Sequence, residues 1–107
     1  MQFIVLGYDG ADEGALERRH AVREEHITLG DKLRAEGKAI FGVAMLDDDG
    51  QMIGSVYVME FENRAELDEW LKVEPYVTGN VWQDIQVFSA KVGGSFEQFL
   101  PESSQAA

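Results

Sequence analysis

The sequence predicts an α+β fold in which a four-stranded antiparallel sheet carries two helices on one face. Three observations lead to this prediction. Short apolar segments and amphipathic segments alternate in the order strand, helix, strand, strand, helix, strand. Residues 47–50, Asp-Asp-Asp-Gly, separate two strand-like segments, and an Asp-Gly pair in that position is a strong hairpin signal. The length of 107 residues is enough for one hydrophobic core, so we expect a single domain.

The first half of the chain predicts one strand and one long helix. Residues 3–8 are apolar and partly β-branched, and the Asp- and Gly-rich residues behind them favour a turn. Residues 13–36 predict one amphipathic helix, which Gly37 is suited to end. The apolar positions of this helix follow one another at helical spacing on a single face. They are Val22, His26, Leu29 and Leu33. His26 thus occupies a place where a leucine would be expected.

The second half predicts a hairpin, a short helix and a last strand. Residues 39–61 form the hairpin around the Asp-Gly turn. Asn63, with Glu66 three residues later, predicts the start of a helix that runs to about residue 71. Pro75 disfavours helical backbone in the residue before it, so we expect a break there and a final strand within residues 80–92. This order of elements predicts the ferredoxin-like arrangement.

Both faces of the predicted sheet are apolar. In the third strand, Ser55, Tyr57, Met59 and Phe61 point one way, and Val56 and Val58 point the other way. Two helices cover only one face, so we expect a homodimer that packs two open faces together; the alternative is that the tail folds back over the open face. Residues 1–92 form the expected domain. Residues 93–107, rich in Gly, Ser and Ala, form a tail that is either flexible or an arm docked on the partner subunit.

Composition excludes several classes of function. Nine basic and twenty acidic residues give a net charge of −11, which disfavours binding to nucleic acid or to anionic membranes. The chain has no cysteine, which excludes disulfides, thiolate nucleophiles and cysteine-based zinc sites. No segment approaches the roughly 18 apolar residues of a membrane span, and the N-terminal residues lack the pattern of a signal peptide. We therefore expect a cytoplasmic protein.

His26 is the best chemical candidate from the residues themselves. Arg19 and Arg23 lie on the same side of the predicted helix, and Gly30, one turn further on, leaves a space beside the imidazole. Two guanidinium groups and a space next to an imidazole suit a small anionic ligand. The alternatives are that His26 is a hydrogen-bonded core residue and that both arginines pair with neighbouring glutamates on the surface. These neighbours are Glu17, Glu24 and Glu25.

Glu74 is the second candidate. A carboxylate at the C-terminal end of a helix opposes the helix dipole, so its position there has no local explanation. The rigid corner at Pro75 can aim the carboxylate at the histidine of the neighbouring helix; the alternative is a solvated glutamate at a helix end. No phosphate-binding loop, nucleophile motif or metal-ligand spacing occurs, so we expect no cofactor and no metal.

Three motifs resemble the YciI-like (YCII-related) protein family. They are Ala-Val-Arg-Glu-Glu-His at 21–26, Gly-Ser-Val-Tyr at 54–57 and Glu-Pro-Tyr at 74–76, within a resemblance over roughly residues 2–92. The resemblance implies a ferredoxin-like fold that dimerises into an α/β barrel, with an active site centred on a His and Asp pair.

Position by position, the resemblance assigns catalytic roles to His26 and Glu74. It places Arg23 and Ser55 at the substrate, where we also expect Arg19 and Tyr76. The family carries Asp where this chain has Glu74. The extra methylene moves the carboxylate by roughly 1 Å, a displacement that can cost about a hundredfold in rate. Either the pocket has adapted or this chain has lost the chemistry.

Two interpretations of function remain open. In the first, the protein is a lyase or isomerase in which His26 moves a proton on an enolic or hydroxyaromatic substrate, as the resemblance implies. Glu74 then orients the imidazole, and Arg23 and Ser55 hold an oxyanion or carboxylate. In the second, the same cleft binds a small molecule without turnover, in a non-catalytic accessory module. The identity of the substrate does not follow from the sequence.

Overall fold

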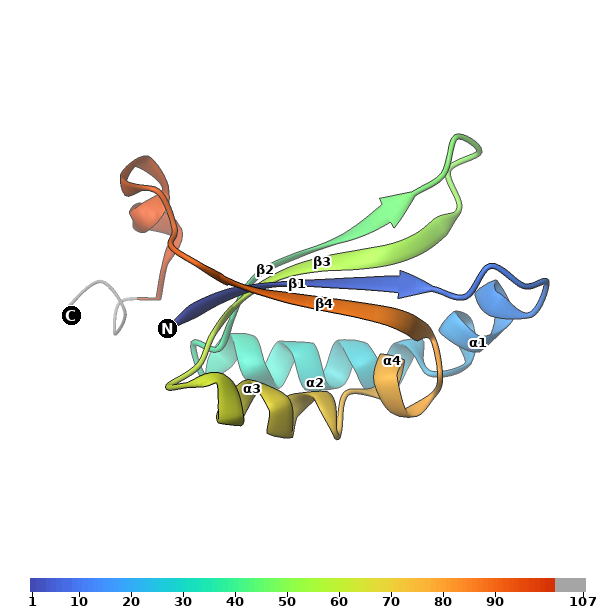
Figure 1. Cartoon of the computed structure of the whole chain (residues 1–107), viewed down its shortest axis with the longest axis horizontal. Coiled ribbons are helices and arrows are strands. Elements are labelled where there is room, and N and C mark those ends of the chain that lie inside the picture. The colour runs from blue at the N-terminus through green and yellow to red at the C-terminus, as the bar shows by residue number, and fades with distance from the viewer. Residues whose placement is uncertain (102–107) are drawn as a thin grey trace.

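The computed structural model describes residues 1–101 as a four-stranded antiparallel sheet with helices on one face (Figure 1). Its elements are β1 (Gln2–Asp9), α1 (Ala15–Ala21), α2 (Arg23–Ala35), β2 (Ala39–Leu46), β3 (Met52–Glu60), α3 (Arg64–Leu71), α4 (Pro75–Thr78), β4 (Trp82–Ala90) and the 3₁₀ helix η1 (Gly94–Phe99). The strand order is β2-β3-β1-β4, and every neighbouring pair is antiparallel. The predicted α+β, ferredoxin-like fold is confirmed.

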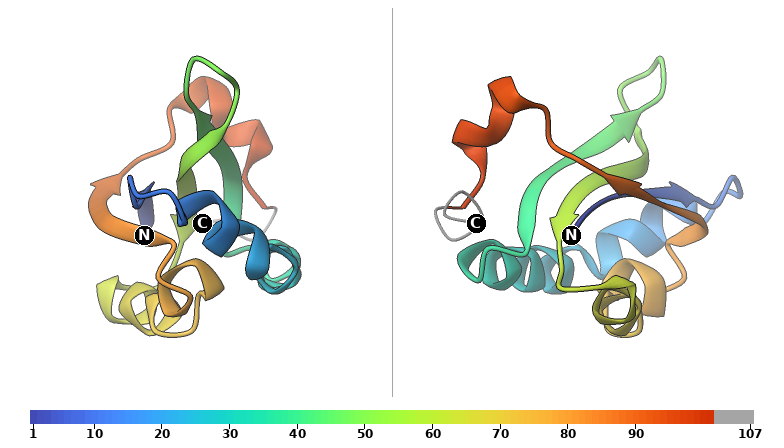
Figure 2. Two further views of the ribbon diagram at one scale, coloured as in Figure 1. Left: turned by 90° about the vertical axis from the view of Figure 1, so that its right-hand side faces the viewer. Right: turned by 60° about the vertical axis from the view of Figure 1, so that its left-hand side comes forward.

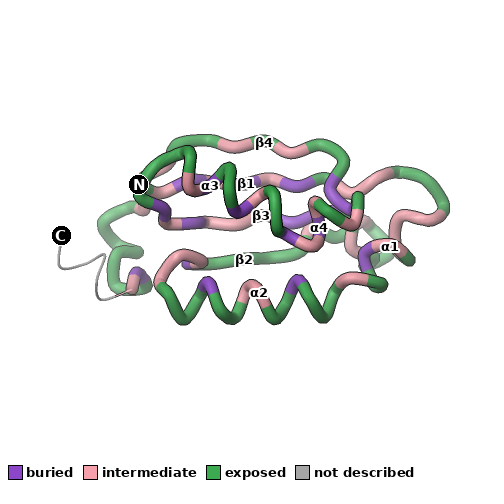
Figure 3. Tube along the Cα trace, turned by 90° about the horizontal axis from the view of Figure 1, so that it is seen from below, coloured by how far each residue is buried: buried purple, intermediate pink, exposed green. Residues whose placement is uncertain are grey.

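The core lies between the central strands and the helices. β1 pairs with β3 on one side and with β4 on the other, and the buried positions concentrate in β1 and β3 (Figure 3). Inward-facing side chains of the sheet meet the apolar sides of α2, α3 and α4, as the alternation in β3 predicts. The buried cluster comprises Phe3, Val5, Leu33, Met59, Phe61, Leu67, Trp70, Tyr76, Val81 and Trp82.

The predicted single helix over residues 13–36 is wrong in one respect, because the structure divides it at Val22. Val22 has φ −116° and ψ 10°, and it ends α1 and precedes α2. The Val22 side chain packs against Gly79, where an added Cβ would come within 3.1 Å of it. Val22 is β-branched, so it has few allowed rotamers in a helix and a lowered helix propensity. We therefore attribute its non-helical backbone to the contact with Gly79.

The break predicted at Pro75 is followed by a helix that the sequence did not indicate. Pro75 occupies the first position of the one-turn helix α4, where proline's fixed φ suits the helix and no backbone donor is lost. Glu74 precedes it in extended conformation, with φ −64° and ψ 122°. The predicted restriction on the residue before proline therefore holds, and the turn of helix behind it fixes the direction of the Glu74 side chain.

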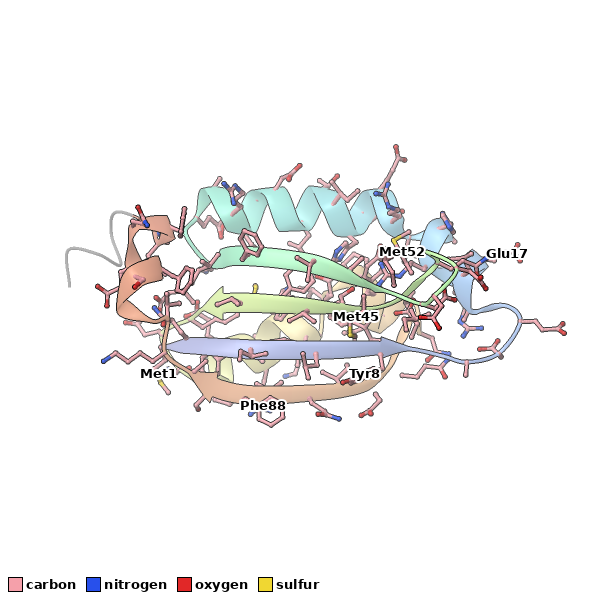
Figure 4. All side chains as sticks on the ribbon, turned by 90° about the horizontal axis from the view of Figure 1, so that it is seen from above. Met1, Tyr8, Glu17, Met45, Met52 and Phe88 are labelled. Atoms are coloured by element: carbon pink, nitrogen blue, oxygen red, sulfur yellow. The ribbon has the colours of Figure 1, made fainter. Side chains whose placement is uncertain are left out.

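Within residues 1–101, no α-helix covers the other face of the sheet (Figure 4). Large apolar side chains remain exposed on it, including Phe41, Val43 and Phe88. η1 lies on this side of the sheet but near one end, so most of the face stays uncovered (Figure 2). The rest of the expected tail, residues 102–107, lies outside the described residues. Within the described part of the chain, no helix has the length and apolar character that a membrane crossing requires.

Candidate functional site

The structure brings His26 and Glu74 together, although 48 residues separate them. His26 lies in the second turn of α2, and Glu74 lies at the corner before α4. Nδ1 of His26 contacts Oε1 of Glu74 in a hydrogen-bonded pair. Glu74 is 1% exposed and His26 is 8% exposed, so the glutamate is not solvated. The extra methylene of Glu74, relative to the family's aspartate, does not separate it from the imidazole.

Two further donors hold the Glu74 carboxylate in place. Trp70 Nε1 donates to Oε2 over 3.1 Å, and the backbone N–H of Tyr76 donates to Oε1 over 3.3 Å. Glu74 therefore caps the N-terminus of α4 while it binds the histidine. A carboxylate with several fixed donors keeps one orientation, which in turn fixes the tautomer and the direction of the imidazole.

The second nitrogen of His26 is also occupied. Its Nε2 lies 2.6 Å from the hydroxyl oxygen of Tyr57. Because the carboxylate accepts from Nδ1–H, the neutral ring accepts the Tyr57 O–H at Nε2. The Tyr76 ring stacks on the imidazole, with centroids 3.8 Å apart and planes 13° apart. Glu74, His26 and Tyr57 thus form a continuous chain of hydrogen bonds.

The two tyrosines beside the histidine are held in their protonated forms. Burial raises the pKa of Tyr57, the negative charge of Glu74 and the neighbouring Tyr76 raise it further, and Arg19 opposes this increase. Burial also raises the pKa of Tyr76, against the opposing charge and hydrogen bond of Arg19. Desolvation disfavours a phenolate in both cases.

Arg19 is buried and belongs to the framework of the site. It is 2% exposed, and its Nε donates to Asp9 Oδ2 over 2.8 Å. Its other donors bind the Gly54 carbonyl at 2.8 Å, Ser55 Oγ at 2.7 Å and the Tyr76 hydroxyl at 3.3 Å. The alternative of a surface pair with neighbouring glutamates is wrong for Arg19. Asp9 Oδ1 is buried and has no hydrogen-bond partner among the described residues.

Ser55 retains one unused hydrogen-bonding function. Its Oγ accepts from Arg19 at 2.7 Å and from Trp82 Nε1 at 3.2 Å. These two donors occupy both lone pairs of the hydroxyl oxygen. Among the described residues no acceptor for the Ser55 hydrogen is found, so this O–H remains available to a ligand.

A cavity of ≈ 180 Å³ opens between α2 and β2 beside these groups. We call it the Arg23 cavity; its polar and aromatic lining residues are Arg19, Arg23, His26, Ser55, Tyr57 and Tyr76. A second cavity of ≈ 200 Å³, the Gly30 cavity, is lined by His26, Gly30, Arg34 and Tyr57, among others. Among the described residues, a Cβ built on Gly30 would meet nothing within 4 Å apart from its chain neighbours and the backbone of its own helix, as the predicted space beside the imidazole requires.

Arg23 is the exposed cation of the Arg23 cavity. Its guanidinium forms no ion pair with any carboxylate of residues 1–101, so the predicted alternative of a surface pair does not hold for Arg23 either. A larger open depression of ≈ 850 Å³ follows the outer side of α2 and also includes Arg23. Neither His26 nor Glu74 lines this depression, so we place ligand binding in the smaller cavity.

The predicted site residues all converge on this region, and sequence reasoning underestimated two others. In the sequence, Tyr57 is identified as an inward-facing residue of the third strand, and Asp9 lies among the Asp- and Gly-rich residues that favour a turn. The two-residue spacing of Ser55 and Tyr57 in a strand was the available signal, because it places both on one face. Nothing in the sequence pairs Asp9 with Arg19. Within residues 1–101, no three His, Cys, Asp or Glu side chains group to hold a metal ion.

Several solved structures resemble this fold, including the following two. The 5-chloro-2-hydroxyhydroquinone dehydrochlorinase of Burkholderia phenoliruptrix, solved with 2,5-dihydroxybenzoquinone, has a TM-score of 0.76 and 25% identity, over 89% of this chain and 98% of that chain. A dimeric ferredoxin-like protein of unknown function from Jannaschia has a TM-score of 0.50 and 17% identity, over 85% of this chain and 98% of that chain. The second likeness shows the fold alone.

Sequence relatives agree with the resemblance in the motifs. Protein YciI of Escherichia coli is 29% identical over 93 residues, which cover 81% of this chain and 93% of the relative. An uncharacterized protein of Haemophilus influenzae has the same identity and coverage. The sequence model of the YCII-related domain matches residues 1–91. The chain therefore belongs to the YCII-related domain family.

Proposed function

We propose that the protein is a small-molecule enzyme that transfers a proton on an enolic or hydroxyaromatic substrate, as a lyase or an isomerase does. The observation that carries this proposal is the buried pair of His26 and Glu74, in which His26 lines the Arg23 cavity and Glu74 lies behind it. A carboxylate that holds one nitrogen of an imidazole prepares the other nitrogen to accept and return a proton. In this role Glu74 is a positioning residue, and His26 is the proton carrier.

The gain in rate that such a proton carrier provides limits the class of reaction. A positioned acid or base typically contributes about 10² to 10⁴ in rate. That is adequate for the removal of a proton from an already acidic O–H or C–H group, and it is too little for hydrolysis of an amide or a phosphate ester. We therefore favour elimination or isomerisation over hydrolysis.

The lining of the cavity favours a small anionic ring. Arg23 supplies an exposed cation without an ion-pair partner among the described residues, and Ser55 supplies an unused O–H donor. Tyr57 and Tyr76 supply aromatic walls on which a flat ring can stack. A volume of ≈ 180 Å³ suits a single substituted ring. The similar dehydrochlorinase binds a ligand of this kind, 2,5-dihydroxybenzoquinone.

Two probes test the proposal directly. The first is exchange of the ring hydrogens of 2,5-dihydroxybenzoquinone for deuterium in D₂O, followed by proton NMR. The second is chloride release from 5-chloro-2-hydroxyhydroquinone, in which the substrate loses one proton and one chloride ion. The test variant is His26→Asn, whose amide can still donate to Glu74. The control is His20→Asn, because His20 is the other histidine of the chain and lies exposed on α1.

We expect the wild-type protein and His20→Asn to accelerate at least one reaction equally, and His26→Asn to be slower by about 10² or more. Equal rates for His26→Asn and wild type would overturn the proposal. Tight binding of 2,5-dihydroxybenzoquinone without acceleration of either reaction would also overturn it. That result would establish the alternative, a non-catalytic binding or accessory module.

The proposal includes a homodimer formed through the open face of the sheet. Phe41, Val43 and Phe88 leave large apolar side chains exposed on this face, and a face-to-face pair would bury them and close the two sheets into a barrel. η1 lies on the same side of the sheet (Figure 2), and it contains the exposed aromatic residues Phe96 and Phe99, which could contact a partner subunit there. Light scattering at micromolar concentration should return about twice the chain mass of 12.0 kDa. A mass equal to one chain would exclude this assembly.

A further inference from the structure

We propose that the hydroxyl group of Tyr57 is the group that exchanges a proton with the bound molecule, and that His26 acts through it. This inference rests on the proposed proton-transfer function and goes beyond it, because it changes which side chain touches the substrate. Tyr57 becomes a catalytic residue, and His26 becomes the proton store behind it.

Both ring nitrogens of His26 are already hydrogen-bonded. Glu74 occupies Nδ1, and the Tyr57 hydroxyl occupies Nε2 at 2.6 Å. Tyr76 covers one face of the ring at a centroid distance of 3.8 Å. The His26 side chain is only 9% exposed. A molecule in the cavity therefore cannot reach an imidazole lone pair without displacing Tyr57, whereas it can meet the Tyr57 oxygen directly.

The position of the Tyr57 ring also favours contact with a bound molecule. Tyr57 lines both the Arg23 cavity and the Gly30 cavity, so it stands where the two spaces adjoin. Gly42 on the neighbouring strand makes this possible: a Cβ there would lie 2.7 Å from Cδ1 of the Tyr57 ring. The absent side chain lets the ring lie against β2 and extend its hydroxyl to α2. The phenol is thus held by packing on one side and by the imidazole at its tip.

Tyr57 stays neutral throughout the relay, because it receives one proton as it gives up another. When a substrate O–H or C–H bond breaks, its proton bonds to Tyr57 Oη and its electron pair stays on the substrate as an enolate or phenolate. The original Tyr57 proton passes to Nε2 of His26, which gives an imidazolium facing the Glu74 carboxylate. The return step reverses both transfers. Arg23 and the Ser55 O–H face the same cavity and can stabilise the substrate anion.

The electrostatic environment suits a relay better than a free base. Burial and the charge of Glu74 raise the pKa of Tyr57, which disfavours a lasting phenolate. In the relay the phenol never becomes one, because it gives up one proton as it receives another. The relay deposits its positive charge on His26, whose Nδ1 contacts the Glu74 carboxylate, so the two opposite charges lie side by side.

The test compares four proteins in the deuterium-exchange and chloride-release assays. They are wild type, His26→Asn, Tyr57→Phe and, as the matched control for loss of a phenol, Tyr8→Phe. Tyr8 lies at the end of β1, outside both cavities. We expect Tyr57→Phe to lose about a hundredfold or more in rate, far more than it loses in affinity for 2,5-dihydroxybenzoquinone. Because the residues act in series, the double variant His26→Asn/Tyr57→Phe should be no slower than the slower single variant.

The opposite result is equally specific. If His26 contacts the substrate itself, removal of the Tyr57 hydroxyl uncovers Nε2, and Tyr57→Phe should be as fast as wild type or faster. That outcome, with His26→Asn still slow, overturns the relay and leaves the proposed function intact. Equal rates for wild type and His26→Asn, or no reaction with wild type, would instead overturn the proposed function and the relay with it.

A measurement on the wild-type protein decides the question if Tyr57→Phe does not fold. The relay moves two protons in one step, and direct transfer to His26 moves one. We expect a plot of the rate of chloride release against the deuterium fraction of the solvent, in mixtures of H₂O and D₂O, to be curved. A straight line would mean that a single proton moves in the rate-limiting step, and it would overturn the relay.

Discussion

The carboxylate of Glu74 binds Nδ1 of His26 inside the protein, and within residues 1–101 it is the hydrogen-bond partner of that nitrogen. The same carboxylate accepts from Trp70 Nε1 and from the Tyr76 backbone. One side chain thus joins α2, α3 and α4 and satisfies three buried donors. Catalytic geometry and folding stability therefore depend on the same group, and variants of Glu74 should change both.

Removal of this carboxylate should destabilise the fold. Glu74→Ala leaves three buried donors without an acceptor, each of which costs about 1 to 3 kcal/mol, so we expect the free energy of unfolding to fall by roughly 3 kcal/mol or more. Urea denaturation followed by tryptophan fluorescence measures the change. Glu62→Ala, at an exposed glutamate, is the control and should be neutral. An unchanged stability for Glu74→Ala would mean that the three contacts contribute little.

The family's aspartate should not be an improvement in this chain. In Glu74→Asp the carboxylate lies roughly 1 Å further from the three donors that the glutamate side chain binds at the same time. We expect Glu74→Asp to be less stable than wild type and to have altered ¹⁵N shifts of the His26 ring in NMR spectra. A variant as stable as wild type, with unchanged ring shifts, would show that the pocket fits either length and has not adapted to glutamate.

The buried ion pair of Arg19 and Asp9 should be sensitive to a change of geometry at constant charge. Arg19→Lys keeps one positive charge but cannot reach four acceptors from one ammonium group. We expect a loss of about 2 to 4 kcal/mol in the free energy of unfolding, because a buried charge loses part of its hydrogen bonding. Arg34→Lys, at an exposed arginine, should leave the unfolding transition unchanged. Equal behaviour of the two variants would contradict the framework role of Arg19.

The order of elements could be predicted from the sequence because its signals are local. The Asp-Gly turn, the Asn63 cap and the alternation in residues 52–60 each depend on neighbours in the chain, and the structure contains all three features. The division of the first helix at Val22 could not be predicted in this way. It depends on packing against Gly79, which is distant in the sequence.

Part of the candidate site could also be predicted from local signals in the sequence. His26 stood out as a polar residue in an apolar stripe, and Glu74 stood out through its motif. The hydrogen bond from Tyr57 to His26 could not be predicted from the sequence. The alternation in a strand shows which face a side chain points to, but it does not show which residue the end of that side chain contacts. The distance between a strand and a helix, and the space left by Gly42, decide that contact.

Alkaline pH should weaken the fold through Tyr57 and Tyr76. Both pKa values are raised above the ordinary 10.0, chiefly by burial. Above about pH 10 the unfolded chain releases protons that the folded chain retains, so the stabilisation is complete below that pH and declines as the pH rises further. Urea midpoints measured from about pH 9 to about pH 11 should fall, and less steeply in Tyr57→Phe than in Tyr8→Phe. Parallel declines in the two variants would contradict the raised pKa of Tyr57.

A single charge on the open face of the sheet should separate the proposed dimer. Val43 lies on edge strand β2, opposite Val56 of β3, and its side chain is 49% exposed in the single chain. Val43→Asp therefore adds a charge that a single chain can leave in water, whereas a face-to-face pair must bury two such charges across its symmetry axis. Val73→Asp is the matched control, because Val73 is 61% exposed after α3, on the helical side.

We expect Val73→Asp to keep the mass of two chains in light scattering and Val43→Asp to return the mass of one, with both proteins folded by circular dichroism. Loss of the dimer in both variants would point to general destabilisation, and a dimer in both would place the interface elsewhere. Val43 also lines the Arg23 cavity, so the activity of a monomeric Val43→Asp protein would not by itself report on the interface. Phe88→Asp, on β4 at the other edge of the same face and outside both cavities, should give the same single-chain mass if the whole face is buried in the dimer.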